Sequence, residues 1–140
     1  MPPRPADLVR EFHAAFGLGI GGRPAEIAPV LAAHRQDLLD EEVTEVAEAS
    51  RGGHLDELAH ELADVVYTVY GTALVCGIDL DAVIAEVHRA NMSKLGPDGR
   101  PVLRADGKVL KGDGYQPPGI AAELRRQGWV PPGAGPGGLV

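Results

Sequence analysis

Two short acidic runs contain the residues of this sequence that are best suited to chemistry. They cover residues 40–45, Asp-Glu-Glu-Val-Thr-Glu, and residues 61–64, Glu-Leu-Ala-Asp. Residues three or four apart lie on one face of a helix, so each run can present a pair of carboxylates. Hard divalent cations prefer oxygen ligands, and magnesium in particular is held by carboxylates together with substrate phosphates. The runs therefore predict a magnesium site with these candidate ligands: Glu41, Glu42, Glu45, Glu61 and Asp64.

The segments around both runs explain how the carboxylates could meet. Each run lies in a stretch with helical periodicity, and Gly52-Gly53 separates the stretches. A short turn makes two helices antiparallel neighbours. The apolar stripe of the first helix includes Val30 and Val43, so its acidic residues face or border the expected core. Carboxylates removed from water need protons, basic partners or cations. Arg51 is the only arginine or lysine between Asp37 and Asp64, which favours cations.

The same periodicity predicts an all-α fold. Helices are expected over residues 6–16, 25–50, 56–76 and 80–92, with a last short helix over 120–127. Short connections favour an antiparallel four-helix-type bundle, which we expect to assemble as a homo-oligomer. Two Asp-Gly turns flank short apolar runs in residues 96–112, a pattern typical of a β-hairpin with strands at Val102–Arg104 and Lys108–Leu110.

These elements are expected to form one domain, residues 1–127. The bundle would reach about residue 95 and the basic hairpin would occupy about 96–112. Residues 17–23 contain four glycines without a dinucleotide-binding pattern and are expected to be a flexible connector. Residues 128–140 are rich in glycine and proline and are expected to be disordered.

Composition excludes several classes of protein. The chain has 140 residues and a net charge of −7, and ten of its twenty acidic residues fall between Asp37 and Asp64. Such an excess argues against a nucleic-acid polymer as partner, because that partner needs a basic patch. A single cysteine, Cys76, excludes an intrachain disulfide and a cysteine zinc cluster. No signal-peptide pattern and no membrane span of about 18 apolar residues is present, so a cytoplasmic protein is expected.

Other interpretations of these features stay open at the level of sequence. The acidic runs could be solvated helix faces. A helical oligomer could use an acidic groove to bind a basic partner without catalysis. A di-iron bundle would need two E-x-x-H motifs, and Glu57-Leu58-Ala59-His60 supplies one. Phe12 and Phe16 could form core or the wall of a flat ligand site. The basic segment Arg89–Lys111 could be a self-packed hairpin or a lid over phosphates.

The motifs together resemble a known family. Glu41-Glu42-x-x-Glu45 followed by Glu61-x-x-Asp64 is similar to the signature of the MazG-like, all-α nucleoside triphosphate pyrophosphohydrolases. Asn91-Met92-Ser93-Lys94, the hairpin and Tyr115 resemble its dUTP/dCTP-type branch. The resemblance covers about residues 12–118. It implies magnesium-dependent hydrolysis of a nucleoside triphosphate, with dUTP favoured, to the monophosphate and pyrophosphate in nucleotide-pool house-cleaning. Mn²⁺ would be able to substitute, and the chain would form a homodimer or tetramer. Phosphoribosyl-ATP pyrophosphohydrolase activity is an alternative within the same broad fold.

The resemblance also implies roles for individual residues. Glu42, Glu45, Glu61 and Asp64 would be metal ligands, with Glu42 also catalytic. Glu41 would bind a further ion or orient the attacking water. The remaining expected substrate contacts are Asn91, Lys94, Lys108, Lys111, Tyr115, His13 and Phe16.

Overall fold

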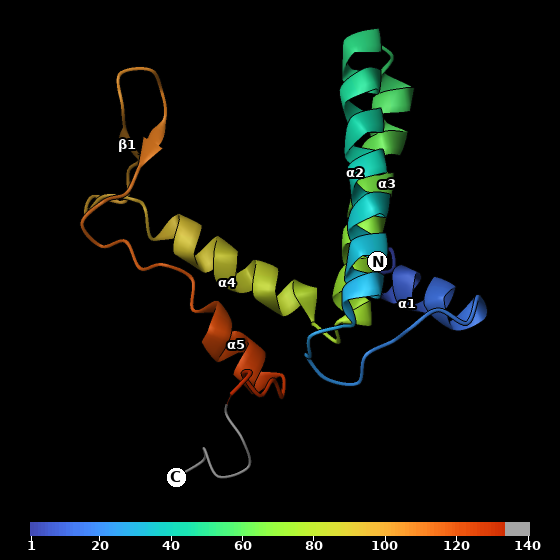
Figure 1. The fold of residues 1–140 in the computed structure, drawn as a ribbon. Helices are drawn as coiled ribbons and strands as arrows, with labels where there is room; N and C mark the ends of the chain where they lie inside the picture. Colours follow the sequence, from blue (N-terminus) through green and yellow to red (C-terminus); the bar gives the residue numbers. More distant parts are fainter. Residues whose placement is uncertain (134–140) are drawn as a thin grey trace. The chain divides into compact units, whose positions relative to one another are not determined.

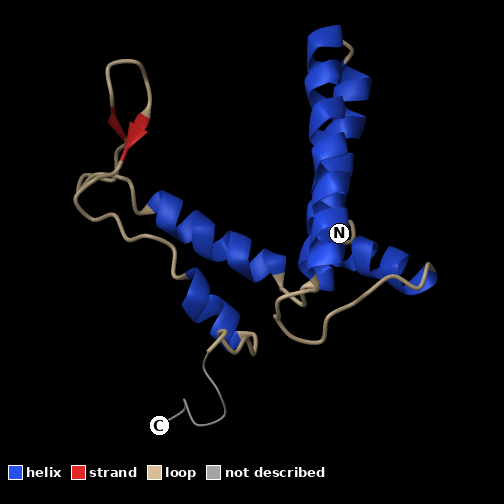
Figure 2. Cartoon of the chain, in the orientation of Figure 1, coloured by secondary structure: helices blue, strands red, loops and turns tan. Residues whose placement is uncertain are grey.

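A computed structural model describes residues 1–133, and these residues form five helices and one two-stranded antiparallel sheet (Figures 1 and 2). The elements are α1 (Pro5–Ala15), α2 (Pro29–Gly52), α3 (Leu55–Val75), α4 (Leu80–Met92), β1 (Val102–Leu103), β2 (Val109–Leu110) and α5 (Ile120–Arg126). The predicted helical fold with a small hairpin is therefore confirmed. Its assembly as a homo-oligomer stays a prediction. Part of the expected disordered tail, residues 134–140, lies outside the described residues.

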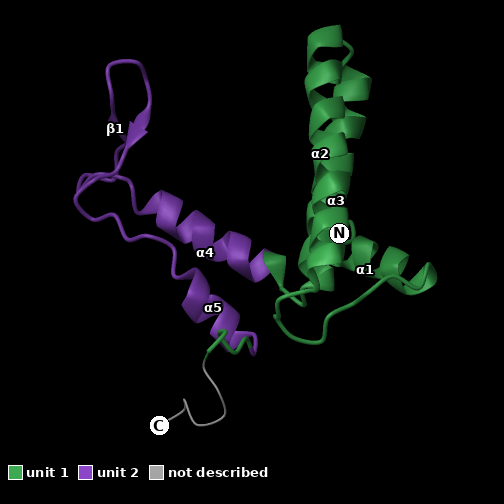
Figure 3. Ribbon diagram, viewed as in Figure 1, with its two compact units in different colours: residues 1–80, 129–140 green, residues 81–128 purple. Residues whose placement is uncertain are grey.

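The chain forms two compact units, coloured separately in Figure 3. The first contains residues 1–80 together with 129–133, and the second contains residues 81–128. Helices α1, α2 and α3 belong to the first unit, whereas the hairpin and α5 belong to the second. The four-helix arrangement and the single domain over residues 1–127 span both units and stay predictions.

An α2–α3 hairpin forms the body of the first unit, and the two helices lie side by side in Figure 1. The turn between them depends on Gly53, whose φ of 74° lies in the left-handed region that favours glycine. Because α3 must then run back along α2, the acidic run of each helix lies beside the other. This turn is the local feature that brings the functional carboxylates together.

Helix α1 packs on α3, and the unit has few buried residues. They are mostly small, and the buried hydrophobic ones are Val9, Ala49, Ala73 and Leu74. His13 is buried with them. The expected apolar stripe of α2 is covered less than predicted, since Val30 is 84% exposed and Val43 is 53% exposed. The reason is that α1 packs mainly on α3, so among residues 1–133 this side of α2 stays open to solvent.

Helix α2 begins at Pro29 rather than at the predicted Ala25. Backbone hydrogen bonds hold the preceding segment against the end of α3, with Gly21 N–H donating to Leu74 O and Ala25 N–H donating to Cys76 O, both at 2.9 Å. A Cβ atom at Gly21 would lie 2.6 Å from the Gly77 nitrogen. The connector is therefore held against the end of α3 at Gly21, and α2 begins only after this hydrogen-bonded segment. Its expected flexibility stays a prediction.

The second unit begins with α4, which has the predicted bounds, and continues into the hairpin. Val102 pairs with Leu110 and Leu103 pairs with Val109, one residue shorter per strand than expected. Asp106 closes the turn by accepting the Lys108 backbone N–H at 3.1 Å. Both strands are exposed on both faces. Within residues 1–133, no helix taken singly has the length and apolar character needed to cross a membrane.

Candidate functional site

Four carboxylates converge between α2 and α3. One oxygen from each side chain lies within 4.8 Å of the others, and we call this set the four-carboxylate group: Glu42, Glu45, Glu61 and Asp64. Each helix contributes two members three residues apart, and the antiparallel turn sets the two pairs opposite each other. The convergence that the spacing predicted is therefore present in the structure.

Two oxygens of the four-carboxylate group are shielded from water. Glu42 Oε2 and Glu61 Oε2 are buried, and neither has a hydrogen-bond partner among the described residues. Burial raises the pKa of Glu42, and the neighbouring Glu45 carboxylate raises it further. A hydrogen bond with Glu45 is the largest cause of the raised pKa of Glu61, followed by burial. Full ionisation of the four-carboxylate group is therefore unfavourable unless a positive charge is bound nearby.

The donor set fits a hard divalent cation. All four donors are carboxylate oxygens, the ligand type that magnesium and manganese take, and the orphaned Glu42 and Glu61 oxygens have no competing partner in residues 1–133. An imidazole borders the group, because His60 Nε2 lies 3.1 Å from Asp64 Oδ2. His60 is exposed and forms an alternative three-residue set with Glu61 and Asp64.

Glu41, the fifth candidate ligand, lies outside the four-carboxylate group. It is exposed and lines a separate open cavity of about 420 Å³ along α2. The other residues that line this cavity are Asp40, Thr44, Glu45 and Glu48. Since Glu45 belongs to both sets, Glu41 is a near neighbour of the group rather than a member. Its role with a further ion or with the attacking water stays a prediction.

The two N-terminal candidates occupy different environments on α1 and just after it. His13 is 3% exposed, and its Nδ1–H donates to the Gly19 carbonyl at 2.9 Å. Phe16 is 68% exposed and stacks against Phe12 with ring centroids 4.4 Å apart. Phe12 also meets Tyr67 edge-on at 5.7 Å. The aromatic residues therefore form a partly open cluster, and contact of His13 or Phe16 with a substrate stays a prediction.

The other five substrate candidates belong to the second unit. Lys94 and Tyr115 are half-buried, whereas Asn91, Lys108 and Lys111 are exposed. The Lys111 ammonium lies 4.9 Å from the centroid of the Tyr115 ring, a cation–π contact. Gly112 N–H donates to the Lys94 carbonyl at 3.0 Å, so Lys94 and Lys111 come from adjoining backbone segments. Contact of these residues with a nucleotide at the four-carboxylate group stays a prediction.

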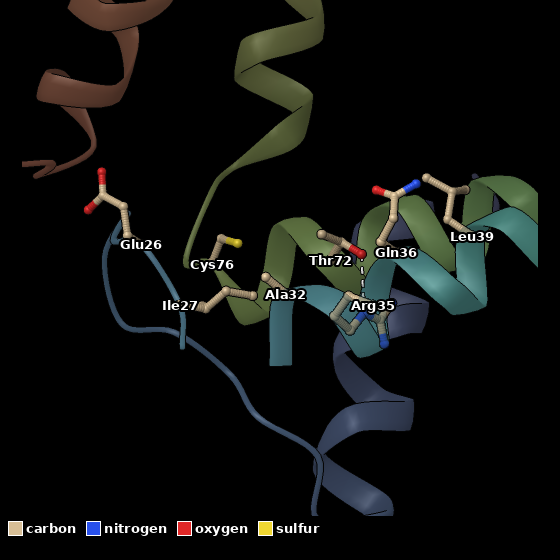
Figure 4. A pocket seen from close by; sticks show the side chains of 8 residues that line it. All are labelled: Glu26, Ile27, Ala32, Arg35, Gln36, Leu39, Thr72 and Cys76. Atoms are coloured by element: carbon tan, nitrogen blue, oxygen red, sulfur yellow. Dashed lines mark hydrogen bonds between the residues drawn. The ribbon is translucent and has the colours of Figure 1, made fainter. Parts of the chain in front are cut away.

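A second cavity of the first unit, also about 420 Å³, was not expected from the sequence (Figure 4). Arg35 crosses from α2 to α3 beside it, donating from Nε to Thr72 Oγ1 at 3.1 Å and from Nη2 to the Thr68 carbonyl at 2.8 Å. Cys76 also lines it, and burial raises the pKa of this thiol. A signal for Arg35 was available, since it interrupts the apolar stripe of α2 midway between Leu31 and Leu39.

Comparisons with known proteins were made at the level of sequence and of structure. The family model described as phosphoribosyl-ATP pyrophosphohydrolase matches residues 9–91. A comparison with curated protein sequences gives no significant match. A solved structure from Exiguobacterium sp. 255-15, provisionally called an NTP pyrophosphohydrolase, is 24% identical with a TM-score of 0.46. The similarity covers 91% of this chain and 97% of that one.

The family match includes both acidic runs and the whole of α2, α3 and most of α4. It agrees with the broader resemblance, an all-α pyrophosphohydrolase, and it leaves the dUTP/dCTP-type branch as a prediction. Because the matched region covers more than half of the sequence, this chain belongs to the phosphoribosyl-ATP pyrophosphohydrolase family.

Proposed function

We propose that this chain hydrolyses a nucleoside triphosphate to the nucleoside monophosphate and pyrophosphate, with magnesium held by the four-carboxylate group. The observation that carries the proposal is the convergence of Glu42, Glu45, Glu61 and Asp64 within 4.8 Å, with two oxygens buried and unpartnered in the described chain. The family match supports pyrophosphohydrolase chemistry in general. Carboxylates alone would repel a triphosphate, so the proposed site needs cations to accept this substrate.

When bound, magnesium would neutralise phosphate charge and act as a Lewis acid toward phosphoryl oxygen. The protein residues have complementary tasks. Glu41 and Glu42 orient the attacking water, and a carboxylate accepts its proton as the new phosphorus–oxygen bond forms. The bond between the attacked phosphorus and the oxygen that bridges the α- and β-phosphorus atoms breaks, and the products are the nucleoside monophosphate and pyrophosphate. Lys94, Lys108 and Lys111 supply positive charge to phosphate oxygens where negative charge develops.

We favour dUTP as the substrate, because Asn91, Lys94, the basic hairpin and Tyr115 resemble the dUTP/dCTP-type branch. Phosphoribosyl-ATP is the second candidate, and the specific observation in its favour is the description of the matching family. The two candidate substrates rest on different parts of the chain. The family match ends at residue 91, whereas the hairpin and Tyr115, which favour dUTP, follow it.

The decisive assay incubates the purified full chain with magnesium and each of a panel of substrates: dUTP, dCTP, dTTP, ATP and phosphoribosyl-ATP. Pyrophosphate and orthophosphate are measured separately. Pyrophosphate release, fastest with dUTP, supports the proposal, while a preference for phosphoribosyl-ATP selects the second candidate. Orthophosphate as the first product, or inertness toward the whole panel, contradicts pyrophosphohydrolase activity.

Metal binding is tested separately from turnover. Titration of the metal-free protein with Mn²⁺, followed by its electron paramagnetic resonance signal, measures bound ion directly. Glu61→Gln should reduce the bound fraction strongly, and the matched control Glu57→Gln should not, because Glu57 is exposed on the same helix outside the group. Equal Mn²⁺ binding by both variants would show that the four-carboxylate group is not the metal site.

A further inference from the structure

The segment that follows the β-hairpin is fastened across the C-terminal half of α4, and we call residues 112–119 the strap. Gly119 N–H donates to Glu86 Oε1 at 2.9 Å, and Gln116 N–H donates to Ser93 Oγ at 2.9 Å. Arg89 Nη2 donates to the Pro117 carbonyl at 3.1 Å. Glu86 and Arg89 on α4, and Ser93 directly after it, therefore hold the strap through its backbone, and Figure 1 shows α4 and the strap side by side.

The beginning of the strap is held without any side chain. Gly112 N–H donates to the Lys94 carbonyl at 3.0 Å. A Cβ atom at Gly112 would lie 2.8 Å from the Leu95 oxygen and 2.9 Å from the Lys94 oxygen, closer than real Cβ atoms approach a backbone. Only glycine permits this approach without displacement of the backbone. Both ends of the strap are thus fixed to the same stretch, Glu86–Leu95.

The anchors are linked to one another as well as to the strap. Arg89 donates to Glu86 from Nε at 3.0 Å and from Nη2 at 2.8 Å, and Glu86 also accepts Gly119 N–H. This arrangement lowers the pKa of Glu86 from its ordinary 4.5 to about 2, with the Arg89 hydrogen bonds as the largest cause. Ser93 Oγ–H donates to the Ala90 carbonyl at 2.7 Å while accepting from Gln116. Each anchor is itself oriented, as expected of groups that fix the geometry of others.

The strap brings together three of the residues proposed to contact substrate. Lys111 precedes it directly, Tyr115 lies within it, and Lys94 accepts its first hydrogen bond. The Lys111 ammonium is stacked on the Tyr115 ring at 4.9 Å. Within residues 1–133, neither Lys94 nor Lys111 has a carboxylate at ion-pair distance, while Arg89 is engaged by Glu86. The two lysines thus keep their charge available for an anion.

We propose that Glu86, Arg89 and Ser93 are positioning residues, which fasten the strap and so hold Lys94, Lys111 and Tyr115 as a preformed site for the phosphate chain of the substrate. The inference rests on the proposed function for the identity of the ligand. It assigns no chemical step to the anchors. Lysine side chains that the strap already holds in place lose less conformational freedom when they bind phosphate. The strap should therefore lower KM and have little effect on kcat.

The test compares Ser93→Ala and Glu86→Gln with the wild type in the full chain with magnesium and dUTP. Each variant removes an anchor and leaves the substrate contacts in place. We expect KM to rise about tenfold and kcat to stay within about twofold, as for loss of uniform binding. Ser93→Thr keeps the hydroxyl and should restore KM. Ser50→Ala, on exposed helix in the other unit, is the matched control and should leave both constants unchanged.

Hydrogen exchange supplies a readout that needs no turnover. The Gln116 amide should lose protection in Ser93→Ala, and the Gly119 amide should lose it in Glu86→Gln. Lost protection together with a raised KM supports the inference. Lost protection with an unchanged KM would show that the strap has only a structural role, and would overturn the inference. Unchanged amide protection in the variants would also overturn it.

Failure of the proposed function is distinguishable from failure of this inference. If the wild type turns over no substrate of the panel, dissociation constants for a non-hydrolysable α,β-imido analogue of dUTP replace KM in the same comparison. Weaker binding by the two anchor variants then supports positioning without catalysis. Equal binding by all variants, or no binding by the wild type, overturns the strap as part of a substrate site.

Discussion

The carboxylates of Glu42 and Glu61 are unfavourable for the metal-free fold but suited to binding a metal ion. Each keeps one carboxylate oxygen out of water, with no hydrogen-bond partner in the described part of the chain. A buried anion without a partner is unfavourable, and further carboxylates nearby make it more so. The raised pKa of both groups is the sign of this conflict. A bound divalent cation would remove this repulsion and give the two buried oxygens a partner. The unpartnered oxygens therefore point to a metal site.

Replacement of Glu42 by glutamine tests the catalytic part of the proposal. The amide has nearly the same shape but no charge, so cation binding and proton acceptance should both suffer. We expect Glu42→Gln to lower pyrophosphate release by at least about 100-fold, the scale on which general acid–base groups act. Glu48→Gln, an exposed residue on the same helix, should retain activity. Retained turnover in Glu42→Gln would count strongly against the assignment.

The same substitution should have the opposite effect on the metal-free fold. Because the pKa of Glu42 is raised above 4.5, the folded protein keeps a proton that the unfolded chain has already released. Stability should therefore fall as pH rises from 4.5 through the folded pKa. Glu42→Gln removes this titration, so with a chelator present it should be more stable than wild type at pH 7 and show a flatter pH dependence. Urea unfolding at a series of pH values measures both.

At the scale of elements, side chains from two other helices meet α3 at Gly71. This buried glycine of α3 faces Arg35 Nη2 from α2, and a Cβ atom there would also lie 3.2 Å from His13 Nε2 of α1. The guanidinium passes over the helix at this point to reach the Thr68 carbonyl. The small residue is thus what allows Arg35 to bridge α2 and α3.

Gly71→Ala should therefore destabilise the first unit. Overpacking of this kind costs about 1–3 kcal/mol, which outweighs the helix propensity that alanine adds. The cost should be smaller when Arg35→Ala is also present, because the crowding guanidinium has been removed. Thermal or urea denaturation of the two single variants and the double variant measures this coupling. Additive effects would show that Arg35 does not crowd the position.

Local patterns in the sequence predicted most elements, and non-local contacts explain the differences. Helix α4 matches its predicted bounds, because the helical periodicity and the Gly77 turn before it, with a φ of 73°, are both local features. The carboxylate convergence was predictable for a similar reason, since it needs only helical spacing and a glycine turn. The start of α2 was not, because backbone bonds between residues 21–25 and the end of α3 decide it. The cavity beside Arg35 likewise depends on segments far apart in sequence.

At the scale of the whole molecule, few hydrophobic residues are buried in either unit. The buried hydrophobic residues within residues 1–133 are Val9, Ala49, Ala73, Leu74 and Ala90, and all but Ala90 belong to the first unit. Helix α2 has 24 residues and buries only Ala49. Larger apolar side chains, including Val43, Leu62 and Val66, remain exposed on the α2–α3 hairpin. Such a surface is typical of a protein that completes its core by association.

Self-association through the α2–α3 hairpin is thus the whole-molecule prediction, in agreement with the expected homodimer or tetramer. Leu62 and Val66 are one helical turn apart on α3, and each is close to half exposed. Val66→Glu places a charge on that surface and should shift the mass measured by light scattering toward the monomer. Its thermal stability should also fall, since association that requires the folded state stabilises it by mass action.

The matched control places the same charge where no association is expected, for example Ala33→Glu, an exposed position on α2 outside this surface. It should leave mass and melting temperature close to those of the wild type. A wild-type chain that stays monomeric and well folded down to micromolar concentration would contradict the prediction, because the exposed leucine and valine side chains would then need no partner. A Val66→Glu protein with unchanged mass would place the interface elsewhere on the chain.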